Sequence, residues 1–139
     1  LSARQLLQPD LARRIEGLLA ASGLDPRLFG VEVTESMLIA NFDQAVLHLE
    51  ALRALGVEVS LDDFGTGYSS LSHLHRLPIS ELKLDMSFVR DLEHSESARA
   101  LTTSILRIGE SLSLKVVAEG VENAAQRAVL PSLDCDLLQ

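Results

Sequence analysis

The chain has few of the residue types that mark secreted, membrane-spanning or disulfide-rich proteins. Cys135 is the single cysteine among 139 residues, so no internal disulfide can form, as is usual in a reducing compartment. No apolar run approaches the roughly 18 residues of a transmembrane helix, and no apolar signal segment stands at the N-terminus. The sequence therefore predicts a cytoplasmic domain without a membrane segment, although a longer parent protein could be membrane-anchored.

Positive charge is also scarce. Lysine and arginine together number 12 against 20 acidic residues, which gives a formal net charge of −8. A protein that binds polymeric nucleic acid normally presents a basic face, and no cluster of lysine or arginine occurs here. We therefore expect no polymeric nucleic acid as partner. If the ligand is an anion, a bound divalent cation is the obvious source of positive charge.

What the chain does contain is a regular alternation of strand-like and helix-like patterns. Strands are expected at 30–36, 57–63, 81–85, 115–120 and 135–139, and helices at 10–23, 41–56, 69–77, 95–113 and 123–130. The helix at 95–113 places Ala98, Leu101, Ile105 and Ile108 on one apolar face. This order predicts one α/β domain with a parallel sheet and helical crossovers.

Charged and amide side chains recur where each expected strand ends. They are Glu32 and Glu35, Asp62 and Asp63, Lys83 and Asp85, Glu119 and Glu122, and finally Gln139. Because the carboxyl ends of parallel strands meet on one face of an α/β fold, these side chains are expected to converge. The pattern predicts an acidic site that contains one amine and one amide.

Two adjacent aspartates, Asp62 and Asp63, close the second strand pattern just before Gly65 and Gly67. On a regular strand their side chains would point to opposite faces. The glycine-containing turn can twist the chain so that both reach the site. Alternatively, Asp63 caps the next helix at residues 69–70, and the sequence does not decide between the two for this residue.

Carboxylates without histidine or cysteine favour hard cations such as Mg²⁺, Mn²⁺ or Ca²⁺, which also remove the repulsion between them. Two such ions suit hydrolysis of a phosphodiester, with Lys83 near the water or phosphate and Glu119 as ligand or base. Enolase-like proton abstraction uses similar groups but leaves the aspartate pair without a clear use. Glu35 could instead be a helix N-terminal charge, and Glu122 part of a helix cap.

The segments that carry these residues resemble a known family. "VEVTES", "DDFGTGYSSL", "LKLD", "VVAEGVEN" and "CDLLQ" resemble, in order, the EAL domain of cyclic di-GMP phosphodiesterases. The resemblance implies part of a modified (β/α)8 TIM-type barrel, with about five parallel strands and intervening helices in this chain. It also implies hydrolysis of cyclic di-GMP to linear pGpG with Mg²⁺ or Mn²⁺, and a homodimer.

The resemblance further implies roles for individual residues. Glu32 would bind the first metal, Asp62 would bridge two metals, and Asp63 and Glu119 would bind the second. Lys83 would hold the hydrolytic water, and Glu119 would be the general base.

The remaining positions are implied to bind substrate or support a loop. Glu35 would brace the loop of residues 62–70, which the family also uses in dimerisation. Asp85, Glu122 and Gln139 match further active-site positions with less defined roles.

Two parts of the family pattern are expected outside the chain. The Glu-Ala-Leu tripeptide and a metal-binding asparagine would precede Leu1, and the final strand would follow Gln139. Residues 1–139 are therefore predicted to form an incomplete EAL domain that is inactive alone, within an active parent. The alternative is a catalytically inactive EAL domain that binds cyclic di-GMP as a sensor or interaction module.

Overall fold

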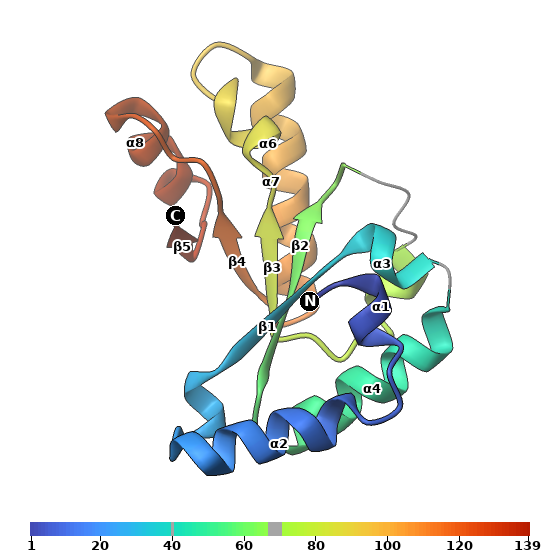
Figure 1. Cartoon of the computed structure of the whole chain (residues 1–139). Helices are drawn as coiled ribbons and strands as arrows, with labels where there is room; N and C mark the ends of the chain where they lie inside the picture. Colours follow the sequence, from blue (N-terminus) through green and yellow to red (C-terminus); the bar gives the residue numbers. More distant parts are fainter. Residues whose placement is uncertain (40, 67–70) are drawn as a thin grey trace.

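The centre of the fold is one parallel β-sheet, described here from a computed structural model that covers residues 1–39, 41–66 and 71–139. Its strands are β1 (Gly30–Thr34), β2 (Glu58–Phe64), β3 (Glu81–Leu84), β4 (Lys115–Ala118) and β5 (Leu137–Leu138). They lie side by side in chain order, and every neighbouring pair is parallel (Figure 1). The predicted α/β fold with five parallel strands is confirmed.

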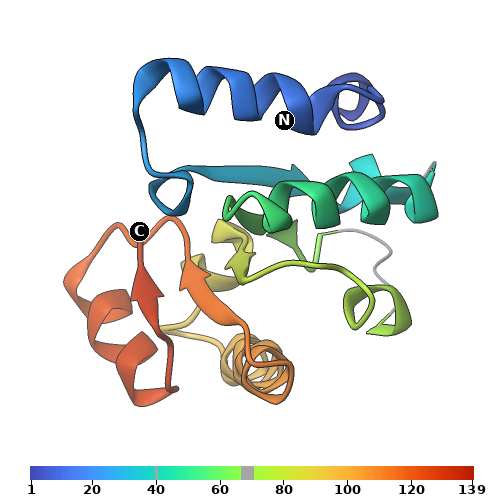
Figure 2. The same cartoon turned by 90° about the horizontal axis from the view of Figure 1, so that it is seen from below.

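Helical segments connect the strands. They are α1 (Ala3–Leu6), α2 (Leu11–Ser22), the 3₁₀ turn η1 (Pro26–Leu28), α3 (Glu35–Ile39), α4 (Phe42–Ala54), α5 (Leu71–Leu74), α6 (Met86–Arg90), α7 (Glu96–Ser111) and α8 (Ala124–Ser132). The sheet is curved, and the longer helices surround its outer side (Figure 2). Within the described ranges, no helix combines the length and apolarity needed to cross a membrane.

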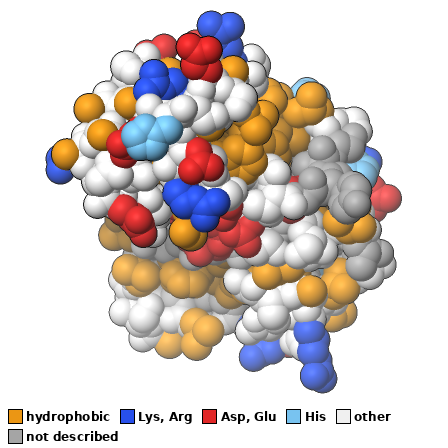
Figure 3. All heavy atoms as spheres, turned by 90° about the horizontal axis from the view of Figure 1, so that it is seen from above, with side chains coloured by type: hydrophobic (Ala, Val, Ile, Leu, Met, Phe, Trp, Pro, Cys, Tyr) orange, Lys and Arg blue, Asp and Glu red, His pale blue; other side chains and the backbone are white. Residues whose placement is uncertain are grey.

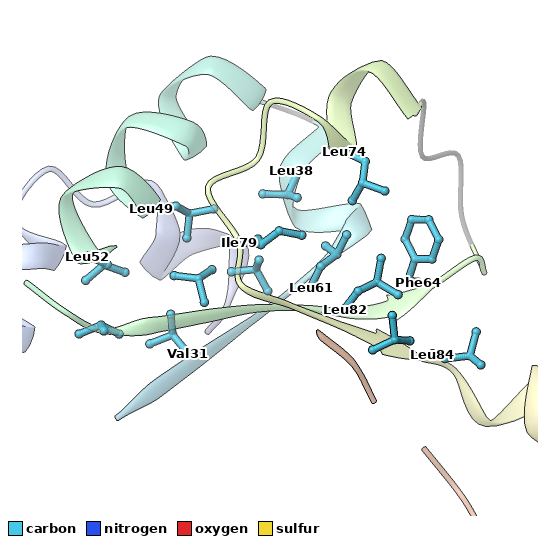
Figure 4. Close-up of a cluster of buried hydrophobic side chains, with 14 of the residues drawn as sticks. Val31, Leu38, Leu49, Leu52, Leu61, Phe64, Leu74, Ile79, Leu82 and Leu84 are labelled. Carbon is cyan, nitrogen blue, oxygen red and sulfur yellow. The ribbon is translucent and has the colours of Figure 1, made fainter. Parts of the chain in front are cut away.

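The outer face of the sheet carries the hydrophobic core. Successive side chains of a strand alternate between faces, so one set of positions points toward the helices. This set comprises Val31, Val33, Val59, Leu61, Leu82, Leu84, Val116 and Ala118, all of them buried. Figure 4 shows several of them packed against Leu38, Leu49 and Leu74 of the covering helices.

The opposite, concave face is polar because the same alternation brings the intervening residues there. Glu32 of β1 is level with Ser60 of β2, and Ser60 is level with Glu81 of β3. The Ser60 hydroxyl is buried and donates a 2.9 Å hydrogen bond to Glu81 Oε1. Toward the strand ends this row continues to Asp62 and Lys83, so the fold places charged groups on a concave surface.

Two helix ends are defined by local caps, and one local prediction is wrong. Asn123 and Gln126 form a capping box at the start of α8, and Gly23 ends α2 in the left-handed conformation at φ 69°. The predicted face of α7 is wrong at Leu101, whose side chain is 50% exposed while Thr102 is fully buried. Gly109 explains the difference, because it lies directly against Val116 of β4 and fixes which side of α7 meets the sheet.

The close approach of α7 to β4 makes a prediction about two glycines. Gly109→Ala adds a Cβ that overlaps Val116 Cγ2, so we expect the free energy of unfolding to fall by about 1–3 kcal/mol. Gly17→Ala is the matched control, because Gly17 lies on the exposed side of α2 with no atom within 4 Å of an added Cβ. This control is expected to gain about 0.5–1 kcal/mol. Urea unfolding of the domain measures both, and a stabilising Gly109→Ala would contradict the packing.

Candidate metal centre

The charged residues predicted from the sequence gather at the carboxyl ends of the strands. Figure 3 looks onto this end of the molecule and shows a group of acidic side chains near its centre. Asp62 and Asp63 of β2 and Glu119 just after β4 each offer a carboxylate oxygen, and these oxygens all lie within 4.8 Å of one another. Residues separated by more than fifty positions are thus brought to one point by strand order and register.

Lys83 is the cation at the centre of this group. It lies between the outward-facing Leu82 and Leu84 of β3, so its side chain points to the concave face, where it is 6% exposed. Its Nζ lies 2.7 Å from Glu32 Oε1, 2.5 Å from Glu119 Oε1 and 3.8 Å from Asp62 Oδ1. The prediction that this lysine faces the site is therefore confirmed by its position.

The ammonium of Lys83 stays protonated because of these neighbours. Burial by itself would lower the pKa of Lys83. Hydrogen bonds to Glu119 and Glu32, together with the charges of Asp62 and Glu119, outweigh burial and raise the pKa above its ordinary value. Lys83 therefore acts as a fixed positive charge near neutral pH.

An irregularity in β2 turns both aspartates toward the same place. The pairing of β2 with β3 shifts register between Leu61 and Phe64, and Asp63 has a positive φ of 54°. The Asp63 amide donates to Asp62 Oδ1 at 3.1 Å, and Thr66 donates its amide and hydroxyl to the Asp63 carbonyl. The distortion begins at Asp63 itself, before the glycines of the turn.

The alternative role of Asp63 as a helix cap concerns residues outside the described part of the chain. Gly67 and residues 69–70, at which that cap would form, are not described. What is described is the carboxylate of Asp63 near those of Asp62 and Glu119. Within the described part of the chain, the Asp63 carboxylate therefore lies beside other predicted site residues.

Like charges crowd around Asp63. Although its side chain is exposed at the surface, loss of hydration raises the pKa of Asp63, and the charges of Asp62 and Asp85 raise it further. Lys83 lowers the pKa only in part. One ammonium therefore does not balance the surrounding carboxylates, and a set of oxygen donors with excess negative charge fits a hard divalent cation such as Mg²⁺ or Mn²⁺.

Glu119 and Glu35 occupy different environments. Glu119 extends the pairing of β4, because its amide donates to the Leu84 carbonyl at 3.1 Å.

Glu35 is the first residue of α3 and is only 5% exposed, and neither of its carboxylate oxygens has a hydrogen-bond partner within the described residues. A buried carboxylate without a partner is costly, so Glu35 is a strained position beside the site. Its predicted contact, the loop of residues 62–70, lies partly outside the described residues.

Three further predicted residues lie at the same end of the sheet. Asp85 caps α6, where its Oδ1 accepts the Ser87 amide at 2.9 Å, a role that the sequence analysis missed although Asp-x-Ser is a recognisable cap pattern. The backbone of Gln139 pairs with Ala118 and Val121 beyond β5.

Glu122 lies at the start of α8, and its carboxylate is not the cap of this helix. Its backbone amide donates to Gln126 Oε1 at 2.8 Å, and its side chain is exposed. Asn123 supplies the cap instead. The alternative that Glu122 belongs to the helix cap is therefore correct for its backbone amide, which bonds to Gln126, and not for its carboxylate.

A comparison with protein-family models places this site in a known family. The model described as "EAL domain" matches residues 1–139, the whole chain. The chain belongs to the EAL domain family. Its resemblance to that family, inferred above from short motifs, is confirmed over the full length.

Curated relatives of this EAL chain are long proteins. It is 46% identical over 139 residues to the signaling protein YkoW of Bacillus subtilis, and these residues are 17% of that protein. It is 45% identical over 139 residues to MucR of Pseudomonas aeruginosa, named a bifunctional diguanylate cyclase and cyclic di-GMP phosphodiesterase, and covers 20% of it. The chain thus spans about a fifth of the length of these relatives.

Solved structures share the fold of this EAL chain. A complex of the PaMucR phosphodiesterase with c-di-GMP superposes with a TM-score of 0.93 at 45% identity, covering 100% of this chain and 56% of that one. A manganese and cyclic di-GMP complex of BlrP1 from Klebsiella pneumoniae gives a TM-score of 0.88 at 40% identity. The match covers 95% of this chain and 34% of the BlrP1 chain. Identities and TM-scores of this size show that this chain has the same fold as those structures.

The crowding at Asp63 predicts that this residue destabilises the metal-free fold. Its folded-state pKa lies above the unfolded value of about 3.9, so its contribution to stability is greatest below that pH and is lost as pH rises through the folded pKa. In EDTA at pH 7, Asp63→Asn is therefore expected to raise the melting temperature, and the gain should vanish near pH 3. Asparagine tolerates the positive φ at this position, so backbone strain stays the same.

Asp25 provides a control of opposite sign. Hydrogen bonds from Arg27 lower the pKa of Asp25 to about 2, so its charged form stabilises the fold at neutral pH. Asp25→Asn is expected to lower the melting temperature at pH 7. A lower melting temperature for Asp63→Asn in EDTA would contradict the electrostatic picture.

Proposed function

We propose that the EAL domain containing this chain hydrolyses cyclic di-GMP to linear pGpG in the presence of Mg²⁺ or Mn²⁺. The observation that carries this proposal is the convergence of Asp62, Asp63 and Glu119 around the buried ammonium of Lys83. It is supported by relatives named as cyclic di-GMP phosphodiesterases, among them NbdA of Pseudomonas aeruginosa and PdeR of Escherichia coli. The solved complexes named above add support for the nucleotide and for a divalent metal.

The donor set fits two divalent ions. Glu32 and Asp62 would hold the first ion, and Asp62, Asp63 and Glu119 would hold the second. When bound, such ions supply positive charge that stabilises the phosphodiester as its P–O bond is displaced in line. The contacts of Lys83 with Glu32 and Glu119 keep these carboxylates turned toward the concave face before a metal binds.

Lys83 and Glu119 have the chemistry needed for attack by water. The Lys83 ammonium is charged near neutral pH, and the N–H that is not bonded to Glu32 or Glu119 can donate a hydrogen bond to the water. The Glu119 carboxylate accepts the proton that the water loses as the water oxygen forms the new P–O bond. The ester P–O bond breaks, and the leaving ribose oxygen takes a proton from solvent water, giving the linear dinucleotide.

The other residues have supporting roles in this proposal. We assign Glu35, which is buried at the start of α3, to bracing the loop of residues 62–70. Asp85 adds negative charge beside Asp63 and starts α6. We assign Glu122 and Gln139, which follow β4 and β5 in the chain, to contact with the substrate.

Three wider features complete the proposal. Residues 1–139 form an incomplete EAL domain, in keeping with a match that covers 56% of the PaMucR chain. The domain acts in the cytoplasm, in keeping with a single free cysteine. It forms a homodimer, which analytical ultracentrifugation of the full-length protein can test.

Turnover of cyclic di-GMP by the full-length protein tests the main proposal. With Mg²⁺ or Mn²⁺ we expect pGpG as product, and Glu119→Gln is expected to lower kcat by about 100-fold or more because the proton acceptor is lost. Glu58→Gln is the matched control, since Glu58 is an exposed carboxylate at the opposite end of β2 from Asp62. Chromatography of the nucleotides over time measures both variants against the wild type.

A different outcome would favour the second function. If folded wild-type protein binds cyclic di-GMP in calorimetry but forms no pGpG with either metal, the hydrolase proposal is rejected. The domain would then be a sensor or interaction module that binds the same nucleotide.

A further inference from the structure

The short helix α6 contacts the chain beside both halves of the candidate metal centre. It begins directly after Lys83, Leu84 and Asp85 at the end of β3, and the Asp85 carboxylate caps its N-terminus through the Ser87 amide. Figure 1 shows α6 above the carboxyl end of β3, between the ends of β2 and β4. This position lets one helix touch two site-bearing segments.

The first contact is between Phe88 and Gly65. A Cβ built on Gly65 would lie 2.6 Å from Phe88 Cζ and 2.7 Å from Cε2, so the phenyl ring fills the space of a side chain. Gly65 has a φ of 94° and follows Asp63 by only two residues. The segment that leaves the aspartate pair therefore rests on the ring of Phe88.

The second contact is between Met86 and Gly120. A Cβ built on Gly120 would lie 2.6 Å from Met86 Cβ and 3.5 Å from Met86 Cα, which are close to the helix backbone and cannot swing away. Gly120 has a φ of 68° and directly follows Glu119. The segment that leaves Glu119 therefore rests on the first residue of α6.

The helix itself is held firmly from behind by α7. Val89 and Leu92 are fully buried, and the Thr102 hydroxyl donates to the Phe88 carbonyl at 3.4 Å. Arg99 donates to the carbonyls that end this segment, at 2.6 Å to Leu92 and 3.0 Å to Glu93. A helix fixed in this way can serve as a common support for whatever packs on it.

We infer that α6 sets the separation between the Asp62–Asp63 pair and Glu119, with Phe88 and Met86 as positioning residues for metal binding. This inference rests on the proposed function only in its use of a divalent metal at these carboxylates. The two glycines let the site-bearing segments approach the helix closely, and the two side chains decide where each segment stops. Groups that orient metal ligands from behind typically change metal affinity by about 10- to 100-fold when they are altered.

The test uses the full-length protein and Mn²⁺ alone as the probe. Phe88→Leu removes the ring edge beside Gly65 and is expected to weaken Mn²⁺ binding about 10-fold in calorimetry without nucleotide. In EDTA, amide hydrogen exchange of Thr66, whose amide bonds to the Asp63 carbonyl, is expected to become faster. Met86→Gly removes the Cβ beside Gly120 and is expected to weaken Mn²⁺ binding in the same direction.

Two controls separate positioning from general loss of stability. Ile79→Val removes one methyl group from a buried position before β3, at the end of the sheet opposite the site, and costs about 0.5–1.5 kcal/mol. It is expected to lower the melting temperature while Mn²⁺ affinity and Thr66 exchange stay the same. Met86→Ala keeps the Cβ that faces Gly120 and is expected to bind Mn²⁺ like the wild type.

Failure of this inference about α6 can be told apart from failure of the proposed hydrolase function. Wild-type protein that binds Mn²⁺ but forms no pGpG rejects the hydrolase, while the variants still measure the role of α6. If Phe88→Leu does not fold, Met86→Gly, compared with Met86→Ala, decides the question. Folded Phe88→Leu or Met86→Gly protein with wild-type Mn²⁺ affinity overturns the inference, as does wild-type protein that does not bind Mn²⁺.

Discussion

The buried ammonium of Lys83 is the interaction on which the rest of the site depends. It is 6% exposed and contacts carboxylates from β1, β2 and the segment after β4. Without a cation at this point, carboxylates from three parts of the chain would face one another on a concave surface and repel. With it, they are held close together yet remain in excess, so the site is preorganised for further positive charge.

Two energetically unfavourable features lie at the carboxyl ends of β1 and β2. Asp63 has a positive φ and a raised pKa, and Glu35 is buried with no hydrogen-bond partner in the described ranges. Unfavourable features of this kind are expected where a protein arranges its side chains to bind a ligand rather than to stabilise the fold. The hydrophobic core on the outer face of the sheet offsets this cost, because nearly every outward residue of the central strands is buried.

The two faces of one sheet therefore have separate tasks. Alternation along each strand sends the valines and leucines of β1 to β4 outward to the helices and Glu32, Ser60 and Lys83 inward. The hydrophobic core on the outer face fixes the positions of the strands, and these in turn fix the positions of the charged side chains on the concave face. Helix α6 belongs to both, since Val89 is buried in the core while Phe88 and Met86 meet the segments beside the site.

The sequence alone was sufficient for the order of strands and helices, for the carboxylates at the strand ends and for the family, because periodicity and short motifs are local signals. The predicted strand ends were also enough to bring Lys83 together with these carboxylates. Short helices such as α6 were missed because a single turn has no period to detect.

Only the tertiary structure decided the side on which Asp63 lies, since the shift that turns it arises from pairing between β2 and β3. It also decided that Thr102, not Leu101, is buried, because the approach of Gly109 to Val116 sets the rotation of α7. These features depend on contacts between segments far apart in the chain. The sequence therefore determined which chemical groups meet, and long-range packing determined their orientation.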